Sequence, residues 1–118
     1  MGKLTTHILD TANGCPAAGV RVRVFAADGA DGRELRGSAV TDADGRCGKP
    51  MLAEGELPRG VYELDFHIGD YFSARMPDDA ARPPFLDVVT VRFGVGADSH
   101  YHIPLLASPY GYTTYRGS

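Results

Sequence analysis

Imidazole groups are the side chains of this sequence best suited to moving protons at neutral pH. The chain contains four histidines, His7, His67, His100 and His102. The ordinary pKa of histidine lies close to physiological pH, so its ring can accept and release a proton during a reaction. A single histidine on a strand is more often structural or simply exposed, so its position must decide between the two interpretations.

His7 and His102 stand out because of the strand faces on which they lie. Successive side chains of a β-strand point to opposite faces, and in residues 4–11 and 100–106 apolar residues alternate with these two histidines. If the apolar residues face a core, both histidines point outward, onto a mixed face that suits a groove or an oligomer interface. His100 has the same parity, but its place at the start of its strand favours plain solvation. This outward face comprises Thr5, His7, Leu9, His100 and His102.

Arg46 is the cation best placed to assist such histidines. It follows the turn sequence Asp44-Gly45, and the simplest interpretation is an exposed loop arginine. The functional interpretation is a fixed guanidinium, which is planar, always charged and suited to binding an oxyanion or polarising a carbonyl.

Other kinds of site find little support. His100 and His102 form only a two-residue clip without a third ligand at a suitable spacing, whereas zinc sites need three or four ligands. Cys15 and Cys47 are expected to be free thiols. No Gly-x-Ser-x-Gly nucleophile motif or phosphate-binding glycine loop occurs in the sequence. The residues alone therefore indicate two outward histidines and a turn arginine, and they leave a zinc site possible in principle but weak.

The elements that must position these side chains are short strands with a period of two. In residues 20–25, three valines alternate with two arginines, which indicates a half-buried strand. Asx-Gly turns separate the strands, because glycine supplies a positive φ and Asn or Asp tolerates one. The pattern predicts an all-β antiparallel sandwich of seven to eight strands. Besides residues 20–25, the expected strands are 4–11, 34–41, 60–67, 86–93, 100–106 and 112–116, with weak pairing near 50–54, and the turns are Asn13-Gly14, Asp28-Gly29, Asp31-Gly32 and Asp44-Gly45.

Two segments depart from this pattern. Residues 69–76 could form one or two turns of helix before a proline-rich loop. Pro104 interrupts the strand at 100–106, and a proline cannot donate a ladder hydrogen bond, so we expect an edge, a bulge or a local end of pairing there.

The length and charge of the chain limit the classes of protein to which it can belong. The 118 residues, 43% of them hydrophobic and 23% charged, predict one globular domain spanning 1–118. The net charge of −3, without a basic cluster, argues against a nucleic-acid or anionic-membrane partner. The start of the chain at Met1 shows no charged and then apolar leader, so we expect a cytoplasmic protein.

Motifs of one known family run along the chain, among them Asp44-Gly45-Arg46 and the closing Tyr-Arg-Gly-Ser at 115–118. By these motifs the sequence resembles the transthyretin-like 5-hydroxyisourate hydrolases, and the closing motif is the most specific part of the resemblance. Cys47, Ala107 and Thr113 depart from the family's usual threonine, leucine and serine, but none of these changes removes a polar site group. The segments that carry the resemblance are 4–11, 14–17, 20–24, 41–46, 62–72, 100–106 and 108–118.

The resemblance implies a fold and an assembly. It implies a two-sheet sandwich with one short helix, assembled as a homotetramer that is a dimer of dimers. The active sites would lie in the channel between dimers, lined by the first strand and the last two. Thr113 and Tyr115 share the parity of the two outward histidines, so the tail is expected to form one wall of the site.

The resemblance also implies a reaction. Water opens a ring of 5-hydroxyisourate, giving 2-oxo-4-hydroxy-4-carboxy-5-ureidoimidazoline during urate breakdown. This hydrolysis needs a base for water, a donor for the oxyanion and an acid for the leaving nitrogen. The sequence leaves open which histidine activates the water. The family's catalytic residues correspond to His7, Arg46, His102 and Ser118; substrate binding falls to His7, Arg46 and Tyr115, and Arg116 and Gly117 support them.

Two alternatives share the fold. A transthyretin-like carrier would bind a small hydrophobic ligand in the same channel without catalysis, because fold does not imply function. Carrier relatives lack the histidine pair, the loop arginine and the closing motif. An adhesion or carbohydrate-binding module would instead be expected to carry a signal peptide or attached domains.

Overall fold

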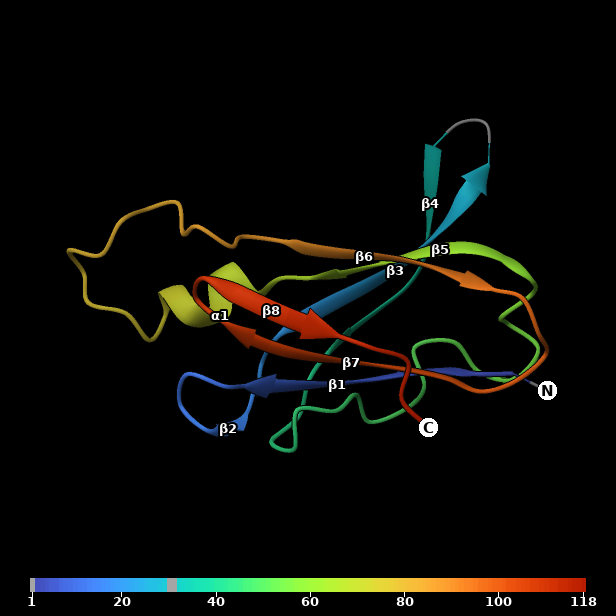
Figure 1. Ribbon diagram of the computed structural model, residues 1–118, viewed down its shortest axis with the longest axis horizontal. Helices are drawn as coiled ribbons and strands as arrows, with labels where there is room; N and C mark the ends of the chain where they lie inside the picture. The colour runs from blue at the N-terminus through green and yellow to red at the C-terminus, as the bar shows by residue number, and fades with distance from the viewer. Residues whose placement is uncertain (1, 30–31) are drawn as a thin grey trace.

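Two stacked sheets make up the molecule, as Figure 1 shows for a computed structural model that describes residues 2–29 and 32–118. Met1 and the first residue of the predicted Asp31-Gly32 turn lie outside the described residues. Within them the chain forms eight strands and one helix, which confirms the predicted all-β sandwich. The elements are β1 (Leu4–Asp10), β2 (Cys15–Pro16), β3 (Arg21–Gly29), β4 (Gly32–Val40), β5 (Gly60–Phe66), α1 (Ile68–Ser73), β6 (Val89–Val95), β7 (Tyr101–Ser108) and β8 (Gly111–Thr114).

The strand order brings the two ends of the chain together. One sheet has the order β2-β1-β7-β8 and the other β4-β3-β5-β6. β1 and β7 run parallel, with His7 opposite Pro104, whereas the remaining strand pairs are antiparallel. The sandwich is therefore not wholly antiparallel as predicted. Most of the chain separates these two strands, so no hairpin turn dictates their relative direction.

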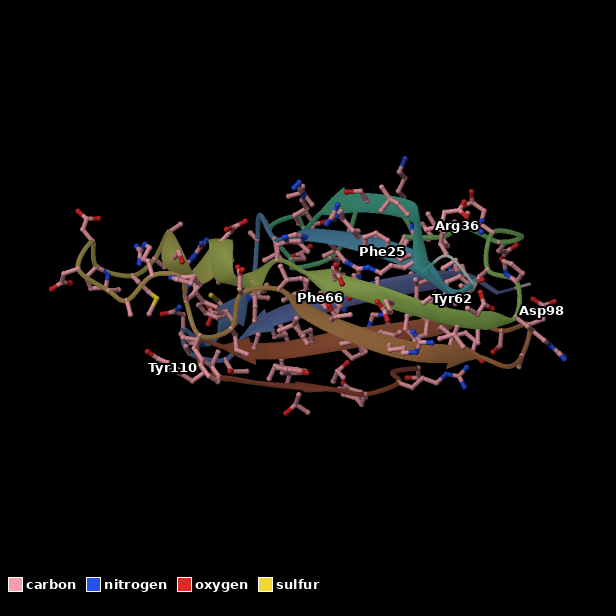
Figure 2. All side chains as sticks on the ribbon, turned by 90° about the horizontal axis from the view of Figure 1, so that it is seen from above. Phe25, Arg36, Tyr62, Phe66, Asp98 and Tyr110 are labelled. Atoms are coloured by element: carbon pink, nitrogen blue, oxygen red, sulfur yellow. The ribbon has the colours of Figure 1, made fainter. Side chains whose placement is uncertain are left out.

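Alternating apolar residues fill the space between the sheets. Leu4 and Ile8 of β1, Leu64 of β5 and Leu105 of β7 are completely buried. Figure 2 labels Tyr62 and Phe66 along β5; both are buried as well, in the same apolar core. Burying each such side chain stabilises the fold by about 1.5–3 kcal/mol. The alternation of apolar residues in the sequence thus corresponds to one face of each sheet, which lies against the core.

The opposite face of β1 and β7 is only half covered. Residues of β1 alternate between buried and half-buried, and the half-buried set contains Thr5, His7 and Leu9. His102 of β7 is half-buried in the same way, while Tyr101 and Ile103 beside it are buried. The predicted outward orientation of His7 and His102 agrees with this burial pattern.

The short helix follows β5 directly and secures the far end of β1. It covers Ile68–Ser73, slightly earlier than the expected 69–76. Tyr71 donates its hydroxyl hydrogen to Asp10 at 2.7 Å. The Asp10 carboxylate also accepts hydrogen bonds from the backbone N–H groups of Ala12 and Asn13. The turn after β1 is thereby tied to the helix.

Several strand limits differ from the expected ones for reasons of pairing. β6 begins at Val89 because its first partner is Phe66, after which β5 gives way to the helix. β8 ends at Thr114, opposite Leu105, so the ladder with β8 stops just before Pro104, which is the predicted local end of pairing. The weak pairing expected near 50–54 is a single bridge between Leu4 and Leu52.

The chain also folds back immediately after β1. Cys15 and Pro16, where no strand was expected, form the short strand β2 against Leu9 and Asp10. Their partners lie on the other side of the Asn13-Gly14 turn, where Gly14 adopts a φ of 67°. A turn of this length brings the following residues back alongside β1.

Candidate active site

Four segments of the chain meet at the outward face of β1 and β7. Thr5 of β1 lies opposite His102 of β7 in the parallel ladder. A bridge joins His7 to Arg46 of the loop after β4, and another joins His102 to Gly117 of the C-terminal tail. Figure 1 shows this tail leaving β8 and passing β7 toward β1. The structure therefore brings one loop and the tail against the two histidine-bearing strands.

A surface cavity of about 420 Å³ lies between these segments. Its walls carry several basic or titratable groups, so the cavity favours an anionic ligand or one that develops negative charge. Among the residues that line it are Lys3, Arg46, Lys49, His100, His102 and Ser118.

The ring of His102 is held on two sides. Its Nδ1 lies 2.8 Å from the hydroxyl oxygen of Thr5. On the other side Gly117 packs so closely that a Cβ at that position would lie 2.6 Å from Cδ2 of the ring. Burial, followed by the positive charges of Arg46, His100 and His7, lowers the pKa of His102 below its ordinary 6.5. Because the charged form is disfavoured, the ring is neutral at neutral pH.

The hydrogen bond of His7 defines its tautomer. Its Nε2 lies 2.9 Å from the carbonyl oxygen of Asp44, and a carbonyl oxygen can only accept. Nε2 therefore carries the hydrogen, and in the neutral ring Nδ1 is left as the basic nitrogen. His7 does not line the cavity itself. It lies beside the cavity, because it forms a backbone bridge with Arg46, which does line it.

Arg46 is presented by a tight turn that only glycine allows. Asp42 accepts a hydrogen bond from the backbone N–H of Arg46 and donates its own N–H to the Arg46 carbonyl. Gly45 adopts a φ of 74°, and a Cβ there would collide with the backbone oxygen of Ile8. The Arg46 side chain is exposed at the rim, free to reach a ligand in the cavity.

The tail is anchored by main-chain and guanidinium contacts. The N–H of Gly117 donates to the carbonyl of His102 at 2.7 Å. Arg116 donates to the hydroxyl of Ser99 at 3.1 Å and to the carbonyl of His100 at 3.2 Å. Its guanidinium also lies 4.0 Å from the ring centre of Tyr101. These contacts place Ser118 at the cavity.

Tyr115 lies apart from the other predicted site residues. It lines a different pocket, of about 140 Å³, together with Tyr101 and Ile103. Thr113 pairs with Leu106 and keeps the expected parity, but β8 ends at Thr114, so strand alternation no longer governs Tyr115. Its role in substrate binding stays a prediction.

Thr5 and His100 contribute more than their sequence positions suggested. His100 is exposed, as expected, yet it lines the cavity and its Nε2 lies 2.8 Å from the Thr5 hydroxyl. Thr5 had the right parity for the site but no assigned role. The two lysines of the cavity, Lys3 and Lys49, had no sequence signal because isolated surface lysines are common.

Among the described residues, neither the thiols nor the acidic groups form a metal site. Cys15 and Cys47 are free, as predicted. In residues 2–29 and 32–118, no three His, Cys, Asp or Glu side chains are grouped to hold a metal ion. Over the same residues, no helix has the length and apolar character needed to cross a bilayer.

Comparison with known proteins identifies chains that are similar in sequence and fold. The model of the HIUase/Transthyretin family matches residues 4–117. A 5-hydroxyisourate hydrolase of Deinococcus radiodurans is 55% identical over 116 residues, which cover 98% of this chain and 95% of the relative. The structure of Klebsiella pneumoniae 5-hydroxyisourate hydrolase superposes with a TM-score of 0.80 at 36% identity and covers 100% of both chains.

A longer protein contains a similar domain. The crystal structure of an (S)-allantoin synthase matches with a TM-score of 0.88 and 42% identity, covering 99% of this chain. The present chain spans only 44% of the length of that protein. With a family model that covers residues 4–117 and a relative of 55% identity, the chain belongs to the HIUase/transthyretin family.

Proposed function

We propose that this chain is a 5-hydroxyisourate hydrolase acting in purine breakdown, with residues 1–118 as a single hydrolase domain. It adds water to 5-hydroxyisourate and opens a ring to give 2-oxo-4-hydroxy-4-carboxy-5-ureidoimidazoline. The observation that carries the proposal is the meeting of His102, Arg46 and the tail around one cavity, with His7 beside it. Curated hydrolases at about half identity over nearly the whole chain support it.

The proton work is divided between His7 and His102. Water must lose a proton as it attacks, and the leaving ring nitrogen must gain one. Nδ1 of His7 is the basic nitrogen left by the bond from Nε2 to Asp44, so His7 is suited to accept the proton of water. His102 lines the cavity and is kept neutral by burial and neighbouring cations, so we assign it to the leaving nitrogen.

Arg46 stabilises the oxyanion that forms when water adds to the carbonyl. The guanidinium is exposed at the cavity, and a fixed donor aimed at developing charge commonly contributes about 3 kcal/mol to transition-state stabilisation. Ser118 lines the same cavity and completes the catalytic set, while Tyr115 contacts the substrate bound by a neighbouring subunit. Arg116 and Gly117 hold the tail in place. The reaction uses water alone, without a metal or organic cofactor.

A homotetramer, arranged as a dimer of dimers, would complete this site. The outward face of β1 and β7 is half-buried already in a single chain and mixes polar with apolar residues. A second copy packed on that face would close the cavity from solvent. Tyr115, which is 58% exposed, could then reach the site of a neighbouring subunit. We assign the enzyme to the cytoplasm.

Following substrate decay tests the proposal. 5-Hydroxyisourate is generated from urate by urate oxidase, and its absorbance is followed with and without substoichiometric amounts of the protein. Faster decay with many turnovers per chain is expected. Stoichiometric ligand binding without acceleration would instead identify a carrier and contradict the hydrolase assignment.

A further inference from the structure

A single hydroxyl group joins two of the histidines at the cavity. The Thr5 oxygen lies 2.8 Å from Nε2 of His100 and 2.8 Å from Nδ1 of His102. Thr5 and His102 are direct partners in the parallel ladder of β1 and β7, which fixes their spacing. The three side chains therefore form a continuous hydrogen-bonded chain from the surface to the cavity.

The number of hydrogens limits how this chain can be arranged. A threonine hydroxyl has one hydrogen to donate and two lone pairs, and a neutral imidazole has one donor and one acceptor nitrogen. Thr5 can therefore donate to only one of the two rings. If it donates to His102, then His100 donates to Thr5 and Nε2 of His102 carries a hydrogen.

The different exposure of the two rings selects this arrangement. His100 is exposed to solvent, and whether it is neutral or cationic it can donate from Nε2. His102 is half-buried, with Arg46, His7 and His100 as positive neighbours and the ammonium groups of Lys3 and Lys49 on the same cavity. It is therefore the ring that stays neutral and accepts at Nδ1. Among the described residues, none hydrogen bonds to its Nε2.

We propose that Thr5 and His100 are positioning residues that act through His102, forming a proton relay in which His102 presents a protonated Nε2 to the substrate. Its catalytic consequence rests on the proposed hydrolase function, whereas the hydrogen positions in the resting protein do not. The tail helps because Gly117 packs against Cδ2 and prevents the ring from turning.

The transfer balances in protons. Nε2–H of His102 passes its proton to the leaving ring nitrogen as the carbon–nitrogen bond breaks. Nδ1 of His102 takes the hydroxyl hydrogen of Thr5, and Thr5 takes the Nε2 hydrogen of His100. The relay ends at the surface, where the exposed His100 ring takes a replacement proton from solvent.

Nitrogen NMR of the resting protein tests the hydrogen positions directly. In protein labelled with ¹⁵N at histidine and held near neutral pH, the His102 shifts are expected to show a protonated Nε2 and an unprotonated Nδ1 that accepts a hydrogen bond. Thr5→Val should remove that hydrogen-bond signature, and Thr5→Ser should restore it. A His102 ring protonated at Nδ1 in the wild-type protein overturns the relay, whatever the activity of the protein.

Turnover tests the catalytic consequence. Thr5→Val keeps a β-branched residue in the strand, and circular dichroism checks its fold. We expect it to lower kcat by about tenfold to a hundredfold, with Thr5→Ser within about threefold of wild type. His100→Gln, which retains an N–H donor but cannot relay a proton, should lower kcat more than it changes KM.

Thr11→Val provides the matched control, because the Thr11 hydroxyl bonds to the Ala107 carbonyl at the opposite end of β1. It should turn over as the wild type does. Wild-type kcat in Thr5→Val, in an enzyme that hydrolyses 5-hydroxyisourate, would refute the relay and leave the hydrolase function intact. An inactive wild type would instead contradict the function, while the NMR result still decides the hydrogen positions.

Discussion

At the scale of single residues, the proposed function gives Arg46 two roles. Its guanidinium is available to an oxyanion in the cavity, and after burial it is the largest cause of the lowered pKa of His102. In the proposed reaction the same positive charge would stabilise a negatively charged transition state, and it disfavours the charged form of the His102 ring. A carrier for apolar ligands would gain nothing from this concentration of charge.

The titration of His102 follows from this arrangement. Because burial and neighbouring cations disfavour the charged ring, NMR titration should give a midpoint below 6.5. Arg46→Ala removes one cation, so the midpoint should rise toward the ordinary value. Arg59→Ala, which removes an exposed arginine elsewhere, should leave it unchanged. A wild-type midpoint at or above 6.5 would contradict the proposed environment.

The same shift affects stability with a defined sign. The pKa of His102 is lower in the folded chain than in the unfolded one, so just below pH 6.5 the unfolded chain binds more protons. The contribution of His102 therefore lowers the free energy of unfolding as the pH falls through that window. The loss ends once the pH lies below the pKa of the folded state.

Asp10 links elements that hold the site strand in place. Its carboxylate is 1% exposed and accepts hydrogen bonds from the turn after β1 and from Tyr71 of α1. Burial raises the pKa of Asp10, but the bonds from Asn13, Tyr71 and Ala12 outweigh it and the net pKa is lowered. The carboxylate is thus charged in the folded protein, and both of its oxygens accept hydrogen bonds.

Asp10→Ala should therefore be strongly destabilising. It leaves the buried Tyr71 hydroxyl and the part-buried donors of Ala12 and Asn13 without their acceptor, and hydrogen bonds to charged groups contribute about 1.5–3 kcal/mol each. We expect the free energy of unfolding, measured in urea, to fall by about 3 kcal/mol. Asp79→Ala, at an exposed position, should change it by less than about 0.5 kcal/mol. Equal stability of the two variants would show that the network contributes little.

The C-terminal tail positions the ring of His102 by close packing. In Gly117→Ala the new methyl group would lie 2.6 Å from the ring, so either the ring or the tail must move. We expect turnover to fall by about tenfold or more, because small displacements of catalytic groups are costly. Gly96→Ala places its methyl in open space and should be fully active. Wild-type turnover in Gly117→Ala would show that close packing of the tail against His102 is not needed for turnover.

The sequence could predict elements more readily than their pairing. Alternation of apolar residues located β1, β3 and β7 and the outward parity of His7 and His102, because the period of a strand is set locally. The parallel pairing of β1 with β7 depends on contacts between residues almost a hundred positions apart. The Thr5 bridge depends on that register and was therefore not foreseen.

The position of Tyr115 shows where the rule of alternating strand faces stops applying. Counting alternate residues from the histidines predicted Tyr115 on the site face. The alternation holds only within a strand, however, and β8 ends one residue before Tyr115. Tail residues follow their own contacts instead, such as the bond from Gly117 to His102. The roles of the tail residues came from the family resemblance and not from spacing.

At the scale of the whole molecule, apolar groups remain exposed at several places. Figure 2 shows Tyr110 at one end of the molecule and Asp98 at the other. The ring of Tyr110, which is 72% exposed, packs against Phe85. Together with Tyr112 and Tyr115 these residues leave aromatic surface uncovered near β8. Such surface is expected where further copies of a chain pack.

The proposed homotetramer makes a simple prediction. Light scattering coupled to size-exclusion chromatography should give a mass of about four times the 12.6 kDa of one chain. Serial dilution should shift that mass toward the dimer before the monomer, as a dimer of dimers requires. A monomer at all concentrations that retained full turnover would contradict the view that a second copy completes the site.

The central claim is that His7, Arg46 and His102 together hydrolyse 5-hydroxyisourate. The most direct test is the initial rate of decay of its absorbance at substoichiometric protein, for the wild type and for His7→Ala, Arg46→Ala and His102→Ala. The account predicts rapid wild-type turnover and a loss of about a hundredfold or more in each variant, with the assembly state preserved. Wild-type rates in all three correctly assembled variants would contradict it.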